Sequence, residues 1–473
     1  MGILNWLKQD VQVKKMVVAV VFIALFLDHM LLSVVVPILP SFLYGSDQPS
    51  TTLENSTGLA VQSPHTQLVN NTSAVLGSTS ATPYHNSTLR GVPFIQIPPT
   101  TNCTQADSRV DAVSIKLGLL FASKSTIQLI FNPFVGSLSD RIGYHILMSV
   151  GFCVIILATT VFAFSSSYIL LLLARSLQGI GGSCLSVAGM SMLADMYKDE
   201  TERGCVMGIS FTGLALGLIV GAPFGSVMYQ FAGKTAPFLV VAVIAVLGGG
   251  LHFIIFQPQR LQIKREKGTP LLTLLMDPYI LIAAGAICLT TLIIGIIETT
   301  LPIWMMKTMC ASKWQQGVVF LPDSVCYLIA SIIFGRLSQK YSVSWLCAFF
   351  GMILAGGTTI SFGYSTNIYP ILAQNALIGI SVGMVDSSVM PFMGYLVDQR
   401  YEPVYGNVYA IADIAVCIGF SVGPAIAGLI MASIGFPLLM AIIGMVNIFF
   451  APLCILLFRP PQREKSLLIS KGN

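Results

Sequence analysis

The sequence predicts an all-α membrane protein with twelve transmembrane helices in two six-helix pseudo-repeats. Three observations support this prediction: an apolar composition, twelve apolar stretches of spanning length, and an internal repeat. Of the 473 residues, 55% are hydrophobic and only 10% are charged, whereas about a quarter of the residues of a soluble domain are charged. We therefore expect the lipid bilayer to surround most of this chain.

The twelve stretches each offer the roughly 20 mostly apolar residues that a spanning helix needs. They are centred near residues 28, 123, 154, 183, 216, 246, 291, 327, 353, 381, 418 and 447. The first stretch is too long for a cleavable signal peptide, and it carries Pro37 and Pro40 where small residues would be expected. We predict that it is the first span.

Basic residues predict the orientation of the chain. If both termini lie in the cytoplasm, seventeen of the 25 Lys and Arg residues lie on that side and six on the other, with Lys124 and Arg175 inside the membrane. This excess agrees with the positive-inside rule. Because the basic residues are scattered over short loops, the net charge of +5 predicts no nucleic-acid partner.

A polar segment over residues 45–110 separates the first two spans. It is rich in Ser, Thr, Asn and Pro and lacks apolar periodicity, so we predict a lumenal loop without regular structure. Its five N-glycosylation sequons are at Asn55, Asn70, Asn71, Asn86 and Asn102. Such sites are modified on the lumenal or extracellular face, which agrees with the orientation predicted from charge.

Eight of the ten cysteines fall in or beside apolar spans, where we interpret them as small buried hydrophobic residues. Cys103, in the polar loop, and Cys310, after the seventh span, would share an oxidising compartment, so we predict a disulfide between them. The sequence predicts no metal site and no cofactor.

Four short motifs recur in the same order at an offset near 200 residues. They are Gly136–Arg141 with Gly335–Lys340, Leu173–Arg175 with Leu372–Gln374, Leu193–Asp195 with Leu396–Asp398, and Gly221–Pro223 with Gly423–Pro424. Ordered matches of this kind indicate duplication. We predict an N-terminal half over residues 1–256, a cytoplasmic linker over 257–277, a C-terminal half over 278–458 and a cytoplasmic tail over 459–473, with substrate bound between the halves.

Two motifs resemble the major facilitator superfamily: residues 136–143 (GSLSDRIG), after the second span, and residues 217–225 (GLIVGAPFG), similar to the glycine–proline motif of its proton antiporters. Longer segments resemble the vesicular monoamine transporters. These segments are residues 34–40 (VVVPILP), 120–124 (LFASK), 174–181 (ARSLQGIG), 301–306 (LPIWMM), 383–388 (GMVDSS) and 408–413 (VYAIAD). The resemblance covers nearly the whole chain except the polar loop and the tail, and it implies the major facilitator fold.

Six ionisable residues lie well inside the predicted spans: Asp28, Lys124, Arg175, Glu298, Asp386 and Asp413. Each would cost roughly 2.5–3.5 kcal/mol at the centre of a lipid-facing helix, so we expect them to face a shared polar interior. Four acids accompany two bases, and at least two carboxylates therefore lack a basic partner. A proton or a cationic substrate can neutralise such a carboxylate, and competition between the two would couple their fluxes.

The family resemblance implies roles for these charges. Asp28 and Glu298 would bind the substrate ammonium group, and Asp386 would carry protons. Lys124 would pair with Asp413, with Arg175 in the same proton-coupling network. Further predicted site residues are Ser183, Phe320 and Tyr327 for substrate and Phe121 and Trp304 for gating. Near the C-terminus, Glu464, Leu468 and Ile469 resemble an acidic dileucine signal for a vesicle sorting adaptor.

The leading hypothesis is a monomeric proton antiporter that loads monoamines of the serotonin, dopamine, noradrenaline and histamine class into secretory or synaptic vesicles. Departures from the family pattern, at His29, Gly182, Leu185, Thr291 and Asp323, keep open another organic cation, such as a trace amine, a polyamine or a choline-like cargo. The six charges disfavour a non-transporting binding protein. The sequence predicts no enzyme, because no HExxH, CxxC, Walker or Gly-x-Ser-x-Gly pattern stands in a soluble context.

Overall fold

The structure, a computed structural model, describes residues 10–46, 108–256, 269–309, 311, 313–340 and 342–458. All regular structure in these residues is helical. The long helices are α2 (Asp10–Ser46), α3 (Ser108–Ile142), α4 (Tyr144–Phe164), α5 (Tyr168–Met196), α6 (Glu200–Ala232), α7 (Thr235–Phe256), α9 (Pro278–Met309), α11 (Leu321–Lys340), α12 (Ser344–Phe362), α13 (Ile368–Arg400), α14 (Gly406–Ile434) and α15 (Phe436–Phe450), which the 3₁₀ helix η1 (Ala451–Phe458) extends. The short helices α8 (Leu271–Leu275) and α10 (Lys313–Val318) lie between long ones.

Eleven segments of the described chain are long and apolar enough to cross a membrane, and α3 is the long helix that is missing from this set. Its 35 residues give a length of about 52 Å, which exceeds the roughly 30 Å of a bilayer's hydrocarbon core. Polar residues lower its hydropathy, among them Lys124, Gln128 and Asn132, all of which are buried. With α3 included, each of the twelve predicted spans corresponds to a helix, and the prediction of a multi-pass helical membrane protein is confirmed.

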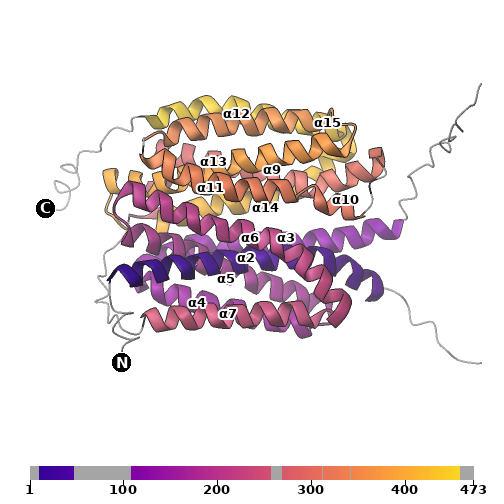
Figure 1. The fold of residues 1–473 in the computed structure, drawn as a ribbon, viewed down its shortest axis with the longest axis horizontal. Helices are drawn as coiled ribbons and strands as arrows, with labels where there is room; N and C mark the ends of the chain where they lie inside the picture. Colours follow the sequence, from indigo (N-terminus) through magenta and orange to yellow (C-terminus); the bar gives the residue numbers. More distant parts are fainter. Residues whose placement is uncertain are drawn as a thin grey trace, which may run out of the picture.

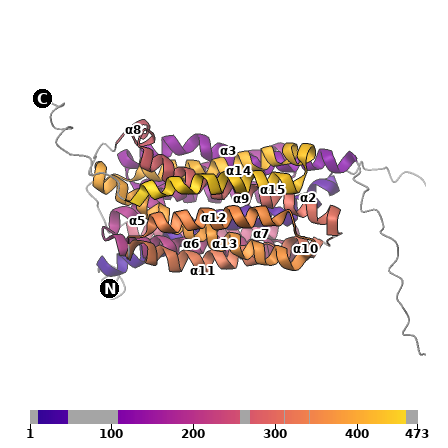
Figure 2. The ribbon, with the colours of Figure 1, turned by 90° about the horizontal axis from the view of Figure 1, so that it is seen from above.

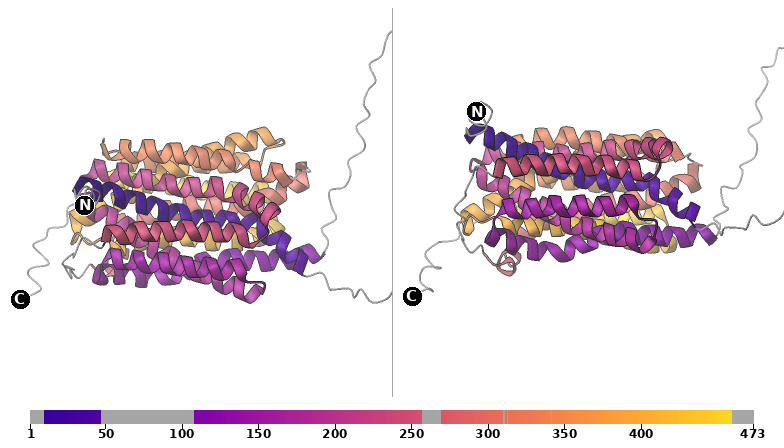
Figure 3. Two further views of the ribbon diagram at one scale, coloured as in Figure 1. Left: turned by 60° about the horizontal axis from the view of Figure 1, so that its bottom comes forward. Right: turned by 90° about the horizontal axis from the view of Figure 1, so that it is seen from below.

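The long helices run side by side along one axis of the molecule (Figures 1 and 2). The beginning of α2 and the end of the last, yellow helix lie at the same end of this bundle (Figure 1). We call this end the base and the opposite end the far end. The indigo-to-magenta helices form one side of the bundle and the orange-to-yellow helices the other, and this division is also visible when the molecule is turned (Figure 3).

Helix packing repeats between the two sides of the bundle. Helix α2 packs on α6 as α9 packs on α14, and α3 packs on α5 as α11 packs on α13. Helix α4 contacts α5 and α7, and its counterpart α12 contacts α13 and α15. The two sides meet mainly where α6 packs on α11 and α3 on α14. The domain boundaries predicted at residues 256, 277 and 458 stay predictions.

Two glycines of the repeated motifs, Gly136 and Gly335, lie at these two contacts between the sides. A Cβ atom on Gly204 of α6 would stand 2.3 Å from the carbonyl oxygen of Gly335 of α11. At the other contact, a Cβ atom on Gly406 of α14 would stand 2.6 Å from the carbonyl oxygen of Gly136 of α3. Real Cβ atoms do not approach so closely, so glycine is required at both contacts. The duplicated motifs therefore meet crosswise, each packing against the other half of the chain.

Several predictions fall outside the residues that the structure describes. These are the glycosylation sites Asn55, Asn70, Asn71, Asn86 and Asn102, the Cys103–Cys310 disulfide, and the sorting residues Glu464, Leu468 and Ile469. The eight cysteines within the described residues are free thiols, and half of them are buried.

Candidate functional site

A buried ion pair joins Asp28 of α2 to Lys124 of α3. Lys124 Nζ donates to Asp28 Oδ2 at 2.8 Å, and the two residues are 4% and 5% exposed. The second carboxylate oxygen, Asp28 Oδ1, is buried without a hydrogen-bond partner in the described structure. A buried acceptor of this kind is costly to leave unpaired, so Asp28 offers one oxygen to an incoming donor.

Asp413 of α14 is held by hydrogen bonds from neutral side chains. Ser186 Oγ donates to its Oδ1 at 2.7 Å, and Gln128 Nε2 donates to its Oδ2 at 2.8 Å. The predicted pairing of Lys124 with Asp413 is therefore wrong for this structure. Gln128 follows Lys124 by one helical turn and fills the position beside Asp413, whereas Lys124 reaches α2.

One face of α3 supplies a row of polar side chains at four-residue spacing: Lys124, Gln128 and Asn132. Asn132 Oδ1 accepts a hydrogen bond from Ser183 Oγ at 2.5 Å. Ser183 is fully buried, so this predicted substrate residue contacts Asn132 in this state. The sequence-based prediction did not include Gln128 and Asn132, although polar residues at four-residue spacing from Lys124 in an apolar span were a usable signal.

Arg175 of α5 is fully buried. Its Nη1 donates to Gln178 Oε1 at 2.9 Å and to the Leu31 carbonyl at 3.4 Å. Its guanidinium carbon lies 5.9 Å from the ring centroid of Phe121, a cation–π contact. Arg175 thus lies beside the Asp28 ion pair without a direct salt bridge to a carboxylate in the described residues.

A second polar group lies on the other side of the bundle. The hydroxyl of Tyr327 (α11) donates to Asp386 Oδ2 (α13) at 3.2 Å, and Asp386 Oδ1 is buried without a partner. Glu298 of α9 has no salt bridge to a described residue. Charge counting predicted at least two carboxylates without a basic partner, and Asp386, Glu298 and Asp413 fit this description among the described residues.

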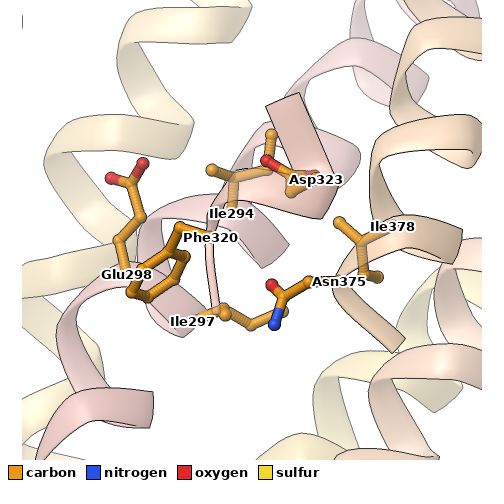
Figure 4. Close-up of a pocket in the computed structure, with 7 residues that line it drawn as sticks. All are labelled: Ile294, Ile297, Glu298, Phe320, Asp323, Asn375 and Ile378. Carbon is orange, nitrogen blue, oxygen red and sulfur yellow. The ribbon is translucent and has the colours of Figure 1, made fainter. Parts of the chain in front are cut away.

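Glu298 lines a small pocket between α9, α11 and α13. Figure 4 shows the residues around it: Ile294, Ile297, Glu298, Phe320, Asp323, Asn375 and Ile378. Phe320, a predicted substrate residue, and Asp323, an acid that departs from the family pattern, are both part of this lining. Glu298 is exposed and lines this pocket, whereas its helix neighbour Ile297 is buried.

Comparison with known proteins matches the chain to the model described as Major Facilitator Superfamily, over residues 21–322 and 283–472. The synaptic vesicular amine transporter of Homo sapiens is 49% identical, an alignment that covers 99% of this chain and 93% of that protein. This chain belongs to the vesicular amine transporter family of the major facilitator superfamily.

Other relatives agree with this assignment. The chromaffin granule amine transporter of Homo sapiens is 48% identical over 98% of this chain and 91% of that protein. The vesicular acetylcholine transporter of Torpedo marmorata is 34% identical over 97% of this chain and 85% of that protein. The solved structure of the human organic anion transporter MFSD10 has a TM-score of 0.70, with 16% identity, 93% of this chain covered and 99% of the other. At this identity the last likeness shows the fold alone.

In this family member the base of the bundle is closed by polar contacts between the two sides. Arg203 of α6, which is 0% exposed, donates to Asp398 of α13 at 2.7 Å. The Tyr405 hydroxyl donates to the other oxygen of Asp398 at 2.6 Å. At the second contact, Gly406 N donates to Asp140 Oδ1 at 2.8 Å. We call Asp140, Arg203, Asp398, Tyr405 and Gly406 the base gate.

Trp304 lies outside this gate and outside the pocket lining. It is buried and its ring stacks on Phe436 of α15 with ring centroids 4.6 Å apart. Phe121 lies beside Arg175, as described above. The gating roles predicted for Trp304 and Phe121 therefore stay predictions.

Three departures from the family pattern take part in helix packing. His29 Nδ1 donates to the Leu25 carbonyl at 3.0 Å and lies 4.0 Å from Asp28 Oδ2. Thr291 Oγ1 donates to the Ile287 carbonyl at 2.8 Å, and Leu185 is buried in the core. Of the three, only His29 lies next to a predicted substrate residue.

Gly182 of α5 lies directly against Asp28. A Cβ atom there would stand 2.7 Å from Asp28 Oδ1 and 3.2 Å from Gln128 Oε1. We expect Gly182→Ala to displace the carboxylate and to lower the free energy of unfolding by about 1–3 kcal/mol, the usual cost of overpacking. Gly182→Ser should lose less, because its hydroxyl can donate to the unpaired Oδ1.

Thermal unfolding of the purified protein in detergent measures this difference. Gly250→Ala is the matched control, because a Cβ atom on Gly250 would meet nothing within 4 Å. Equal unfolding temperatures for Gly182→Ala, Gly182→Ser and the control would show that Gly182 does not limit the approach of Asp28.

Proposed function

We propose that this chain is a proton-coupled antiporter that loads cytoplasmic cationic monoamines, of the serotonin, dopamine, noradrenaline and histamine class, into acidic secretory or synaptic vesicles. The observation that carries the proposal is the 49% identity, over 99% of the chain, to proteins that are synaptic vesicular amine transporters. Identity to the vesicular acetylcholine transporters is lower, at 34%, which favours an amine over a choline-like cargo.

Asp28 supplies the chemistry for amine binding. A protonated amine is a cationic N–H donor, and charge-assisted hydrogen bonds to a carboxylate are about twice as strong as neutral ones. Asp28 Oδ1 is an acceptor without a partner, and Asp28 Oδ2 is already bound to Lys124. An amine that binds both oxygens must displace Lys124, so the lysine acts as an internal competitor that releases the substrate.

Carboxylates without a basic partner supply the coupling to protons. Glu298, Asp386 and Asp413 each require a proton or a cation for neutralisation in a medium of low dielectric constant. A difference of one pH unit across the membrane supplies about 1.4 kcal/mol per proton. When a proton and an amine compete for the same carboxylate, the movement of one drives the other, and no cofactor is required.

Alternating access would follow from rocking of the two sides about the glycine contacts described above. The base gate is closed while Glu298, nearer the far end, is exposed. We assign the base to the cytoplasm, because seventeen of the 25 basic residues lie on that side of the predicted topology. One chain contains the whole pathway, so we propose a monomer that moves its cargo without covalent chemistry.

Competition distinguishes the proposed cargo from a choline-like one. Uptake of labelled serotonin into membrane vesicles that contain the protein would be measured with unlabelled dopamine, noradrenaline or acetylcholine present. We expect both monoamines to inhibit at concentrations at least about tenfold lower than acetylcholine. Equal inhibition by acetylcholine would refute the proposed selectivity.

A further inference from the structure

The small pocket between α9, α11 and α13 brings a second acid, Asp323, to Glu298. The two residues enter it from different helices (Figure 4), and none of its seven lining residues is basic. The pocket leaves room for about one water molecule. It is therefore too small for an organic substrate group, and water and protons are the species that fit between the two carboxylates.

Close helix packing fixes the position of Asp323, which lies in the first turn of α11. A Cβ atom on Gly379 of α13 would clash with the carbonyl oxygen of Asp323, so the backbones of α11 and α13 touch at this level. Helices α6 and α12 also pack on α11. Residues 217–232 of α6 and the whole of α12 contain no charged side chain, so neither segment supplies a base for Asp323.

The titratable groups that act on Asp323 are a carboxylate, a thiol and a phenol. Glu298 of α9 repels its charge, and Cys326 and Tyr327 interact with it from its own helix. The Tyr327 hydroxyl, one turn after Asp323, donates to Asp386 of α13 at 3.2 Å, and the second oxygen of Asp386 is buried without a partner. No basic group among the described side chains acts on Asp323. Asp323 is thus a neighbour of both Glu298 and the Tyr327–Asp386 hydrogen bond.

Charge neutrality limits what the Glu298–Asp323 pair can hold. Two neighbouring carboxylates share a proton, because two like charges in such a site cannot both ionise without a large cost. The pair is neutral with an ammonium group on Glu298 and a proton on Asp323, and it is also neutral with a proton on each carboxyl. A change from the first neutral set to the second replaces one amine by one proton.

We propose that Asp323 is a proton shuttle that serves Glu298 during proton-driven uptake. When the ammonium group leaves Glu298 toward the lumen, the proton on Asp323 passes through the water-sized space to the Glu298 carboxylate. Asp323 then takes its next proton from the lumen, so only O–H bonds form and break, and one lumenal proton replaces one amine. The inference rests on the proposed function, since it assumes that protons and amines exchange at Glu298.

Two assays on the same proteoliposomes separate a proton shuttle from a structural acid. Net serotonin uptake driven by an inside-acid gradient requires proton transfer. Exchange of external labelled serotonin for internal unlabelled serotonin, at equal pH on both sides, does not. We expect Asp323→Asn to slow net uptake at least about tenfold, the loss of a proton-transfer group, and to change exchange less than about twofold. Asp323→Glu should retain both rates, because it keeps a titratable acid.

A structural role gives a different result in these assays. An acid in the first turn of a helix also stabilises the helix N-terminus, and loss of that contribution would slow uptake and exchange together. Equal loss of both rates in Asp323→Asn, or wild-type net uptake by this variant, would overturn the proposal. Ile378→Val changes the same lining without removing an acid and should retain both rates.

The wild-type protein separates a failure of this inference from a failure of the proposed function. Absence of gradient-driven uptake in folded wild-type protein would refute the proposed function, and the shuttle with it. Gradient-driven uptake that Asp323→Asn leaves intact would refute the shuttle alone. Rates are normalised to the amount of folded protein, and Asp323→Ser replaces Asp323→Asn if the latter does not fold.

Discussion

Replacing Asp28 by Asn is expected to lower amine uptake at least about 100-fold. The substitution removes the negative charge that the substrate ammonium requires, and loss of one partner from a buried charge pair costs about 3–5 kcal/mol, equivalent to a factor of more than 100. Uptake of labelled serotonin, normalised to the amount of folded protein, measures the effect. Wild-type uptake by Asp28→Asn would refute the role of Asp28.

The ion pair with Lys124 adds a second effect to this substitution. Asp28→Asn leaves the buried Lys124 ammonium without its partner, so the variant should also unfold at a lower temperature. From the sequence alone we would expect folding to be unaffected, since the resemblance assigns Lys124 to Asp413. The double variant Asp28→Asn/Lys124→Met should regain stability but not uptake, which separates the substrate role from the structural one.

Replacing Asp398 by Ala is expected to open the base gate. Arg203 is 0% exposed and bonds to Asp398 at 2.7 Å, so removal of the carboxylate leaves a buried charge unpaired, at a cost of about 3–5 kcal/mol to the base-closed state. A cycle that passes through this state should slow at least about tenfold. Initial rates of serotonin uptake measure the change.

A charge exchange is the control for this prediction. Arg203→Asp alone and Asp398→Arg alone should both be defective, and the double variant should regain part of the rate because the pair is restored with reversed polarity. Failure of the double variant to exceed either single variant would indicate that the two residues act separately, not as one gate.

The span pattern could be predicted from the sequence because lipid imposes it. Backbone groups inside a bilayer are satisfied within helices, so apolar runs correspond to spans with few alternatives. The repeated glycines Gly136 and Gly335 predicted duplication, and the structure adds that they lie at the contacts between the two sides. The span centred near residue 123 was predicted as well and corresponds to α3, although buried polar residues lower the hydropathy of this helix.

The partners of the buried charges could not be predicted in the same way. A sequence shows that Lys124, Asp28 and Asp413 are inside spans, but the distance between helices decides which acid the lysine reaches. Here Gln128 donates the hydrogen bond to Asp413, and Lys124 reaches Asp28 instead. Asp323 was recognised as an additional acid, but its position across a pocket from Glu298 depends on the close packing at Gly379.

Uptake of labelled serotonin into proteoliposomes with an imposed inside-acid gradient tests the central claim most directly. The same vesicles with the gradient collapsed by an ionophore, and vesicles with Asp28→Asn, are the controls. Our account predicts accumulation that depends on both the gradient and Asp28. Accumulation that persists without the gradient, or none in wild-type protein that is correctly folded, would contradict it.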